Sequence, residues 1–172
     1  MQEYFKQEYL IEAMKQRKKV LIQYFVMLTI YLIVSGGILL YYTALPYGSK
    51  IISTVKVIQF ILCAIFVIIS FIFLEIRFSR VNNYFNVCKN MTIGLKETSI
   101  VNFFEYNENL TQKDGVDMKS LVFLEWNKFK KDYYERNVYV FYEKEFPVLK
   151  ENAQVKIVTQ GNVLYSYEII EE

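Results

Sequence analysis

The chain contains no histidine, two cysteines and two prolines. The lack of histidine removes the commonest general base near neutral pH and the commonest metal ligand. Cys63 and Cys88 do not indicate a disulfide, because a helix running between them would hold them too far apart for a bridge. There is also no glycine-rich phosphate-binding loop, no metal-ligand spacing and no nucleophile beside a base. The sequence therefore predicts a protein that is not an enzyme and that has no cofactor or metal.

Charge is missing from two apolar runs, residues 20–42 and residues 57–74. Each is close to the roughly 20 residues that a helix needs to cross the hydrocarbon core of a bilayer. The first run is too long for the apolar core of a signal peptide, so we expect it to be a retained anchor. The two runs predict a two-pass membrane protein of the cell membrane.

Basic residues are unequally distributed around the two runs. The connecting loop has only Lys50 and Lys56, whereas the flanks carry nine basic residues, namely Lys6, Lys15, Arg17, Lys18, Lys19, Arg77, Arg80, Lys89 and Lys96. Because positively charged segments stay on the cytoplasmic side, both termini are predicted to be cytoplasmic. Two glycosylation sequons, at Asn90 and Asn109, would require the opposite orientation, and we interpret them as chance matches.

These signals divide the chain into six segments. We expect an amphipathic lead-in helix (1–19), a first transmembrane helix (20–42), a short outer loop (43–56), a second transmembrane helix (57–74), a juxtamembrane helical extension (75–91) and a cytoplasmic β-rich domain (92–172). The lead-in has apolar pairs at helical spacing from residue 3 onward and neither glycine nor proline.

Small and weakly polar residues of the two runs fall at matching depths in an antiparallel hairpin. Small residues let membrane helices approach closely, and hydroxyl groups can hydrogen-bond across the pair. The predicted packing seam consists of Thr29, Gly36, Gly37, Cys63, Ala64 and Ser70. The alternative is that these residues face lipid or their own backbone.

Short strand-like runs follow from residue 92. We expect strands at 94–106, 118–126, 138–143, 153–159 and 163–170, with a polar loop at 107–116. For the final hairpin, a three-residue loop at residues 160–162 would set Ile157 opposite Tyr165, whereas a two-residue loop would set Lys156 opposite Tyr167. Since matching apolar faces fix the register, the three-residue loop is predicted.

Residues 125–136 show helical spacing of aromatic residues interleaved with lysines. A short helix here could place Trp126, Lys128, Phe129, Lys130 and Lys131 on an anionic membrane surface. Alternatively, its aromatic stripe caps the barrel while its lysines face water, and we expect this second arrangement.

The predicted fold class is an α+β membrane protein in which a two-helix transmembrane hairpin precedes a small, mainly-β cytoplasmic domain. Short strands with one helix among them suggest a barrel of the OB or SH3-like kind. Residues 151–170, a polar turn followed by a hairpin, resemble the end of the small barrel in NfeD-type membrane proteins. That resemblance has no specific motif and implies no functional residues.

Two functions fit these features. The first is a non-enzymatic accessory or scaffold subunit of a membrane assembly, whose partners are the lipid bilayer and other membrane proteins or further copies of the chain. The second is a membrane-anchored sensor or binding module for a small ligand, a peptide or a lipid headgroup. The net charge of +2 is too small to suggest a nucleic-acid partner. A pore-forming or immunity role is left open by the sequence.

Overall fold

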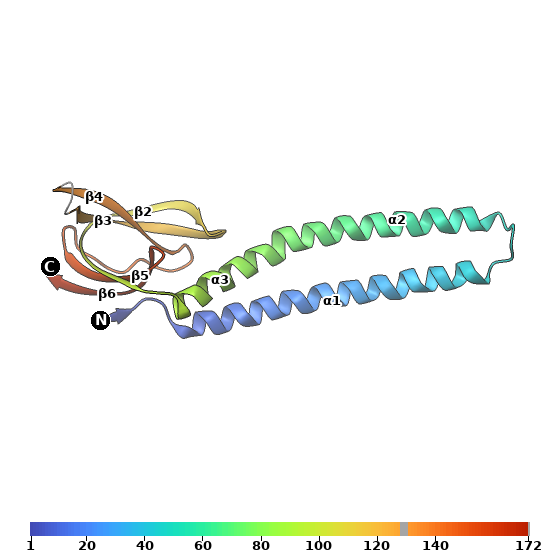
Figure 1. Cartoon of the computed structure of the whole chain (residues 1–172), viewed down its shortest axis with the longest axis horizontal. Coiled ribbons are helices and arrows are strands. Elements are labelled where there is room, and N and C mark those ends of the chain that lie inside the picture. The colour runs from blue at the N-terminus through green and yellow to red at the C-terminus, as the bar shows by residue number, and fades with distance from the viewer. Residues whose placement is uncertain (128–130, 172) are drawn as a thin grey trace. The chain divides into compact units, whose positions relative to one another are not determined.

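The structure, a computed structural model, describes residues 1–127 and 131–171. The chain forms two compact units, Lys15–Asn82 and a second unit that joins Met1–Met14 to Asn83–Glu172. The first unit is an antiparallel pair of helices, and the second contains a closed β-barrel together with helix ends (Figure 1). Two long apolar helices and a small barrel confirm the coarse α+β prediction.

Two continuous helical stretches contain the apolar runs. Helix α1 spans Gln7–Ala44, and α2 (Ile51–Ile72) continues through η1 (Phe73–Phe78) into α3 (Ser79–Ile93). Both stretches are long and apolar enough to cross a membrane. The predicted lead-in is thus part of α1, which begins at Gln7 and not at residue 3, because Gln2 and Glu3 pair as strand β1 (Gln2–Glu3) with the barrel.

The segment η1 is a π-helix, in which the Ser79 N–H donates to the Leu74 carbonyl. One turn of this wider helix lies where the second apolar run ends and the charged side chains Glu75 and Arg77 begin. Such segments are uncommon and occur mostly as single turns inside α-helices. Sequence spacing alone predicted an ordinary α-helix here.

Five strands close the barrel. They are β2 (Glu97–Lys113), β3 (Val116–Asn127), β4 (Asp132–Phe141), β5 (Gln154–Gln160) and β6 (Val163–Glu171). Their order around the barrel is β2-β3-β4-β6-β5, and β5 pairs again with β2. All neighbours are antiparallel except β4 and β6, which meet in parallel at Tyr139 and Val163.

The barrel interior is an apolar core in which alternate residues of every strand meet. Fully buried members include Phe123, Val138, Val155 and Ile157. Period-two alternation explains this set, because every second side chain of a strand points to the same side. Burial of such side chains contributes roughly 1.5–3 kcal/mol each, so the interior is a large source of stability for the domain.

The polar loop predicted for residues 107–116 is wrong in extent. Strand β2 continues to Lys113, and only Asp114 and Gly115 form the turn to β3. Both turn residues have positive φ, 52° and 70°. Asp-Gly is a preferred pair for the two-residue turn that matches the twist of a hairpin. The sequence reading mistook a polar strand end for a loop.

The helix predicted for residues 125–136 is also wrong in its described part. Strand β3 runs to Asn127 and β4 begins at Asp132, in unbroken antiparallel register. Trp126 and Tyr133, which helical spacing would place on one face, are instead direct partners across the two strands. Aromatic residues also favour strands, so this spacing did not distinguish the two structures.

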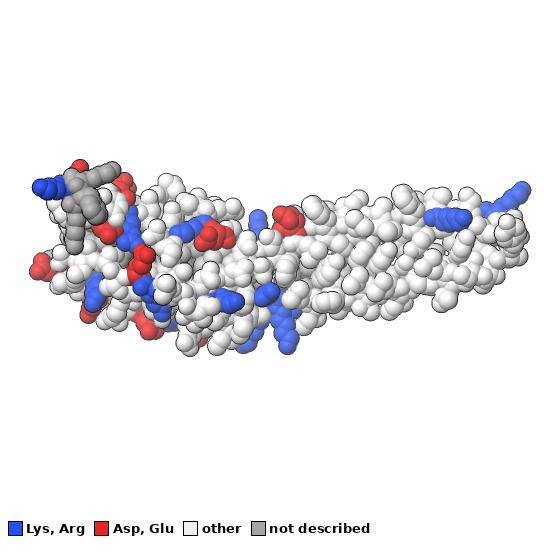
Figure 2. All heavy atoms as spheres, viewed as in Figure 1, with Lys and Arg blue, Asp and Glu red and all other residues white. Residues whose placement is uncertain are grey.

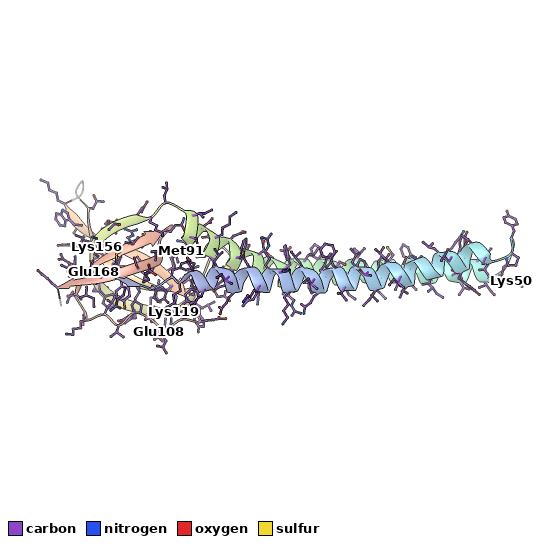
Figure 3. All side chains as sticks on the ribbon, turned by 90° about the horizontal axis from the view of Figure 1, so that it is seen from below. Lys50, Met91, Glu108, Lys119, Lys156 and Glu168 are labelled. Atoms are coloured by element: carbon purple, nitrogen blue, oxygen red, sulfur yellow. The ribbon has the colours of Figure 1, made fainter. Side chains whose placement is uncertain are left out.

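The final hairpin has a two-residue turn, Gly161-Asn162, and not the predicted three-residue loop. A bulge restores the matching of apolar faces. The register shifts between Val158 and Thr159, so that Ile157 faces Tyr167 and Lys156 faces Glu168 (Figure 3). The sequence argument correctly required matched faces but did not include an extra residue in one strand.

Candidate functional site

The two helices of the Lys15–Asn82 unit meet through aromatic and polar contacts. The Tyr31 and Phe66 rings stack with centroids 3.9 Å apart, and Gln59 Nε2 donates to Ser35 Oγ at 2.6 Å. Most other side chains of the apolar runs are exposed on the helix surfaces, where Figure 2 shows few charges over α1 and α2. A surface of this kind is suited to lipid or to other membrane helices.

The residues of the predicted packing seam differ from one another in their surroundings. A Cβ atom added to Gly36 or Gly37 would meet no atom within 4 Å, so neither glycine marks a close approach between these helices. Thr29 Oγ1 donates to the Phe25 carbonyl of its own helix at 2.8 Å. It therefore makes no bridge to Ser70.

The remaining predicted seam residues differ from one another in exposure. Cys63 and Ala64 are exposed, whereas Ser70 is buried and its hydroxyl has no hydrogen-bond partner among the described residues. Sequence reasoning missed Ser35 and Gln59. The side-chain amide of Gln59 inside an otherwise apolar run was the signal that could have identified it. An amide group surrounded by hydrocarbon needs a hydrogen-bond partner from the protein itself.

A second core joins the helix ends to the outside of the barrel. Phe5 and Ala13 from the N-terminal segment and Val87, Cys88 and Met91 from α3 are all buried. They pack against the barrel residues Val116, Met118, Phe141 and Val163. Figure 3 shows Met91 beside the barrel strands.

Backbone contacts fix the N-terminal segment in this core. The N–H groups of Tyr4 and Phe5 donate to the Tyr165 carbonyl at 3.0 and 2.9 Å. Strand β1 pairs with β6 next to this point, with Glu3 opposite Ser166. The first residues of the chain are therefore an integral part of the barrel unit.

The thiol of Cys88 is buried in the second core. Desolvation raises its pKa from 9.0 to about 11, and its side chain is fully buried. Burial also raises the pKa of the neighbouring Tyr84 hydroxyl. A thiol that stays protonated is a poor nucleophile, so Cys88 serves packing.

The guanidinium of Arg136 fills one end of the barrel. Its Nη1 donates to Glu125 Oε2 at 2.9 Å and to Ser99 Oγ at 3.0 Å. Its Nη2 donates to Thr159 Oγ1 at 3.1 Å and to Asn162 Oδ1 at 3.0 Å. All four acceptors come from separate parts of the barrel, so this side chain ties strands and the last turn together.

Two of the predicted membrane-surface residues, Trp126 and Lys131, lie at the end of the β3–β4 hairpin. We call Glu125–Asn127 and Asp132–Glu135 the β3–β4 arm. Trp126 is 49% exposed and Tyr133 54% exposed, and their rings make an edge contact with centroids 5.0 Å apart. Trp126 therefore does not cap the barrel, which corrects the arrangement that we expected from the sequence.

Of the three lysines in that prediction, the structure describes only Lys131. Lys131 is exposed and has a φ of 52°, and its N–H donates to the Asn127 carbonyl at 2.9 Å. Lys128, Phe129 and Lys130 lie outside the described residues.

Comparison with known proteins gives no relationship from which a function could be transferred. No family model, no curated protein and no solved structure matches the chain significantly. Function must therefore be argued from the geometry of this chain.

Proposed function

We propose that the chain is a two-pass membrane protein that acts as a non-enzymatic accessory or scaffold subunit of a membrane assembly. In this proposal the hairpin lies in the cell membrane with both termini and the barrel in the cytoplasm. The apolar helices and the excess of basic residues on their flanks support it.

The second core is the observation that carries this proposal. Phe5 of the N-terminal segment and Met91 of α3 are both buried against the barrel. The barrel is thus held to the ends of both helical stretches by side-chain packing, in addition to the covalent connection of the backbone. A domain attached in this way is suited to presenting a surface, which is what a scaffold requires.

The barrel is further proposed to be of the OB type. Its strand order, with β4 beside β6 in parallel, favours the OB over the SH3-like alternative. This assignment alone implies no ligand, because one fold supports many functions.

Photo-crosslinking in native membranes tests the scaffold role. A photoreactive amino acid at Phe60 (75% exposed), Leu40 (73%) or Phe71 (69%) should crosslink the full chain to a reproducible set of membrane proteins. The matched control is the same probe at Val55, which is buried between the helices and should give no intermolecular product. Lipid adducts alone at all three exposed positions, with no membrane protein co-purifying, would contradict the proposal.

The second candidate function is a binding module, and the exposed pair Trp126 and Tyr133 favours it. Aromatic side chains of this exposure are typical of recognition surfaces. A fragment of residues 92–172 is unsuitable for testing it, because that fragment lacks Phe5, Ala13, Val87, Cys88 and Met91 of the second core. Binding tests require the full chain in a nanodisc.

A further inference from the structure

The outer edge of β4 is open along most of its length. On one side β4 pairs with β3 from Met118–Phe141 to Asn127–Asp132 without a break. On the other side the structure, over the residues that it describes, pairs β4 with another strand only at Tyr139. Residues 132–138 therefore present an unpaired sheet edge.

The direction of the backbone groups on this edge follows from one hydrogen bond. The Tyr139 N–H donates to the Asn162 carbonyl at 2.8 Å, away from β3. Because backbone groups alternate along a strand, those of Asn137, Glu135 and Tyr133 point to the same side. The Tyr133 N–H already donates to Asp132 Oδ1 at 2.8 Å, so the free outward N–H groups are those of Glu135 and Asn137.

Side chains along the edge supply both contact area and charge. Tyr133 and its partner Trp126 form an exposed aromatic pair on one face of the β3–β4 arm. Asp132 and Glu135 are exposed acids on the edge strand itself. Arg136 also belongs to this stretch, but its guanidinium is mostly buried and is bonded to Glu125, Ser99, Thr159 and Asn162. Lys131 lies in the turn and not on the edge.

A second copy of the chain fits this edge poorly. Antiparallel pairing of β4 with its own copy about the centre of the outward-facing residues sets Glu135 opposite Glu135. Like charges directly opposite each other destabilise a strand pair. A partner strand with a basic side chain opposite Glu135 would instead stabilise the strand pair.

We propose that the outer edge of β4 binds an extended basic segment of a partner protein, which adds as a further strand. Outward backbone groups of Glu135 and Asn137 would hydrogen-bond to the segment, while Trp126 and Tyr133 pack on its side chains. This inference rests on the proposed scaffold role and names the class of partner that the barrel would hold.

The single tryptophan of the chain makes the test direct, because Trp126 is the only indole fluorophore. The full chain in nanodiscs of uncharged lipid is titrated with a short capped peptide of alternating Lys and Val. We expect a saturable change in Trp126 emission. The same peptide with every backbone amide N-methylated keeps its side chains but cannot join a sheet, and it should give no saturable change.

Charge reversal gives the second arm of the experiment. Glu135→Lys should weaken binding of the Lys/Val peptide about tenfold and strengthen binding of a Glu/Val peptide, because the sign of the contact is reversed. The matched control Glu108→Lys reverses an exposed acid of β2 and should leave both affinities unchanged. Unchanged circular dichroism shows that each variant is folded.

Several results would overturn the inference. They are the absence of a saturable change, equal binding of the N-methylated peptide, or equal losses from Glu135→Lys and Glu108→Lys. A response to anionic vesicles but not to peptide would assign the arm to lipid headgroups, and concentration-dependent dimerisation that Glu135→Gln strengthens would assign it to a second copy. Peptide binding without any crosslinked membrane protein would overturn the assembly proposal alone.

Discussion

The barrel unit has apolar and aromatic side chains of two kinds, those buried in its cores and those exposed to solvent. Cys88 and Met91 are completely buried, whereas the aromatic residues Trp126 and Tyr133 are half exposed. Composition cannot distinguish these two groups, because burial depends on what a strand or helix faces. Substitutions at the two kinds of position therefore have different expected outcomes.

Alkaline pH should destabilise the second core through Cys88. Its folded-state pKa of about 11 lies above the ordinary value of 9.0, so its contribution to stability is complete below pH 9 and is lost as the pH rises towards 11. The expected slope is at most about 1.4 kcal/mol per pH unit. Denaturant unfolding of the full chain, followed by circular dichroism from pH 8 upward, measures it. Cys88→Ala should flatten the profile between pH 9 and pH 10 and leave the loss at higher pH that comes from Tyr84 and Tyr4, whose pKa values burial also raises. An unchanged profile would contradict this assignment.

Trp126→Ala should leave the barrel folded. The side chain is 49% exposed and its main ring contact is with Tyr133, so the expected loss is about 1 kcal/mol for one cross-strand aromatic pair. Thermal unfolding followed by far-ultraviolet circular dichroism measures this. Phe123→Ala, which removes a fully buried ring, is the matched control and should cost about 3–5 kcal/mol. Unfolding caused by Trp126→Ala would mean that the ring belongs to the core.

At the scale of elements, the sequence predicted what depends on local pattern. Uncharged runs identified the helices, and alternation of apolar residues located most of the strands. The pairing of Gln2 and Glu3 with β6 joins residues about as far apart as the chain allows, and no local pattern specifies it. The register shift beside Thr159 is likewise not visible in the local sequence pattern, and matching residues by depth takes no account of how each helix is rotated about its axis.

Two glycine turns of the barrel should respond differently to substitution. Gly115 and Gly161 both have positive φ, 70° and 55°. A Cβ at Gly161 would meet open space, whereas one at Gly115 would overlap the Asn83 amide of α3. Gly161→Ala should lower the free energy of unfolding by roughly 1 kcal/mol, as expected for a residue with a Cβ in the left-handed conformation. Gly115→Ala should lower it by more. Denaturant midpoints of the two variants measure the difference, and equal losses would show that Asn83 moves aside freely.

Within the helical hairpin, Gly37→Ala should be neutral or stabilising. The added methyl group meets no atom within 4 Å, and alanine is favoured over glycine in a helix by about 0.5–1 kcal/mol. Ser35→Ala is the informative comparison, because it removes the acceptor of the Gln59 hydrogen bond and should cost about 1 kcal/mol. Thermal stability in detergent ranks the two variants. A larger loss from Gly37→Ala would restore the glycines to the packing seam that the sequence predicted.

At the scale of the whole molecule, the barrel unit includes both ends of the helical hairpin. Phe5 and Met91 are buried in the same core although they lie at opposite ends of the hairpin in the sequence. Both flanks of the hairpin must therefore be on one side of any membrane that it crosses. This requirement agrees with the basic residues that surround both flanks.

We propose a two-pass protein whose barrel is cytoplasmic, and thiol labelling in intact cells tests this orientation. Single cysteines belong at Tyr47, which is fully exposed in the loop between α1 and α2, and at Glu151 in an exposed barrel turn. Asn162 is a poorer position, because its side chain accepts a hydrogen bond from Arg136. The background carries Cys63→Ala and keeps the buried Cys88.

A membrane-impermeant thiol reagent should label Tyr47→Cys in intact cells and label Glu151→Cys only after the cells are lysed. The parent with Cys63→Ala alone should remain unlabelled in both conditions, because Cys88 is buried and protonated. Labelling of Glu151→Cys in intact cells, with Tyr47→Cys protected, would contradict the orientation. Labelling of neither or of both before lysis would contradict a two-pass hairpin with an outer loop.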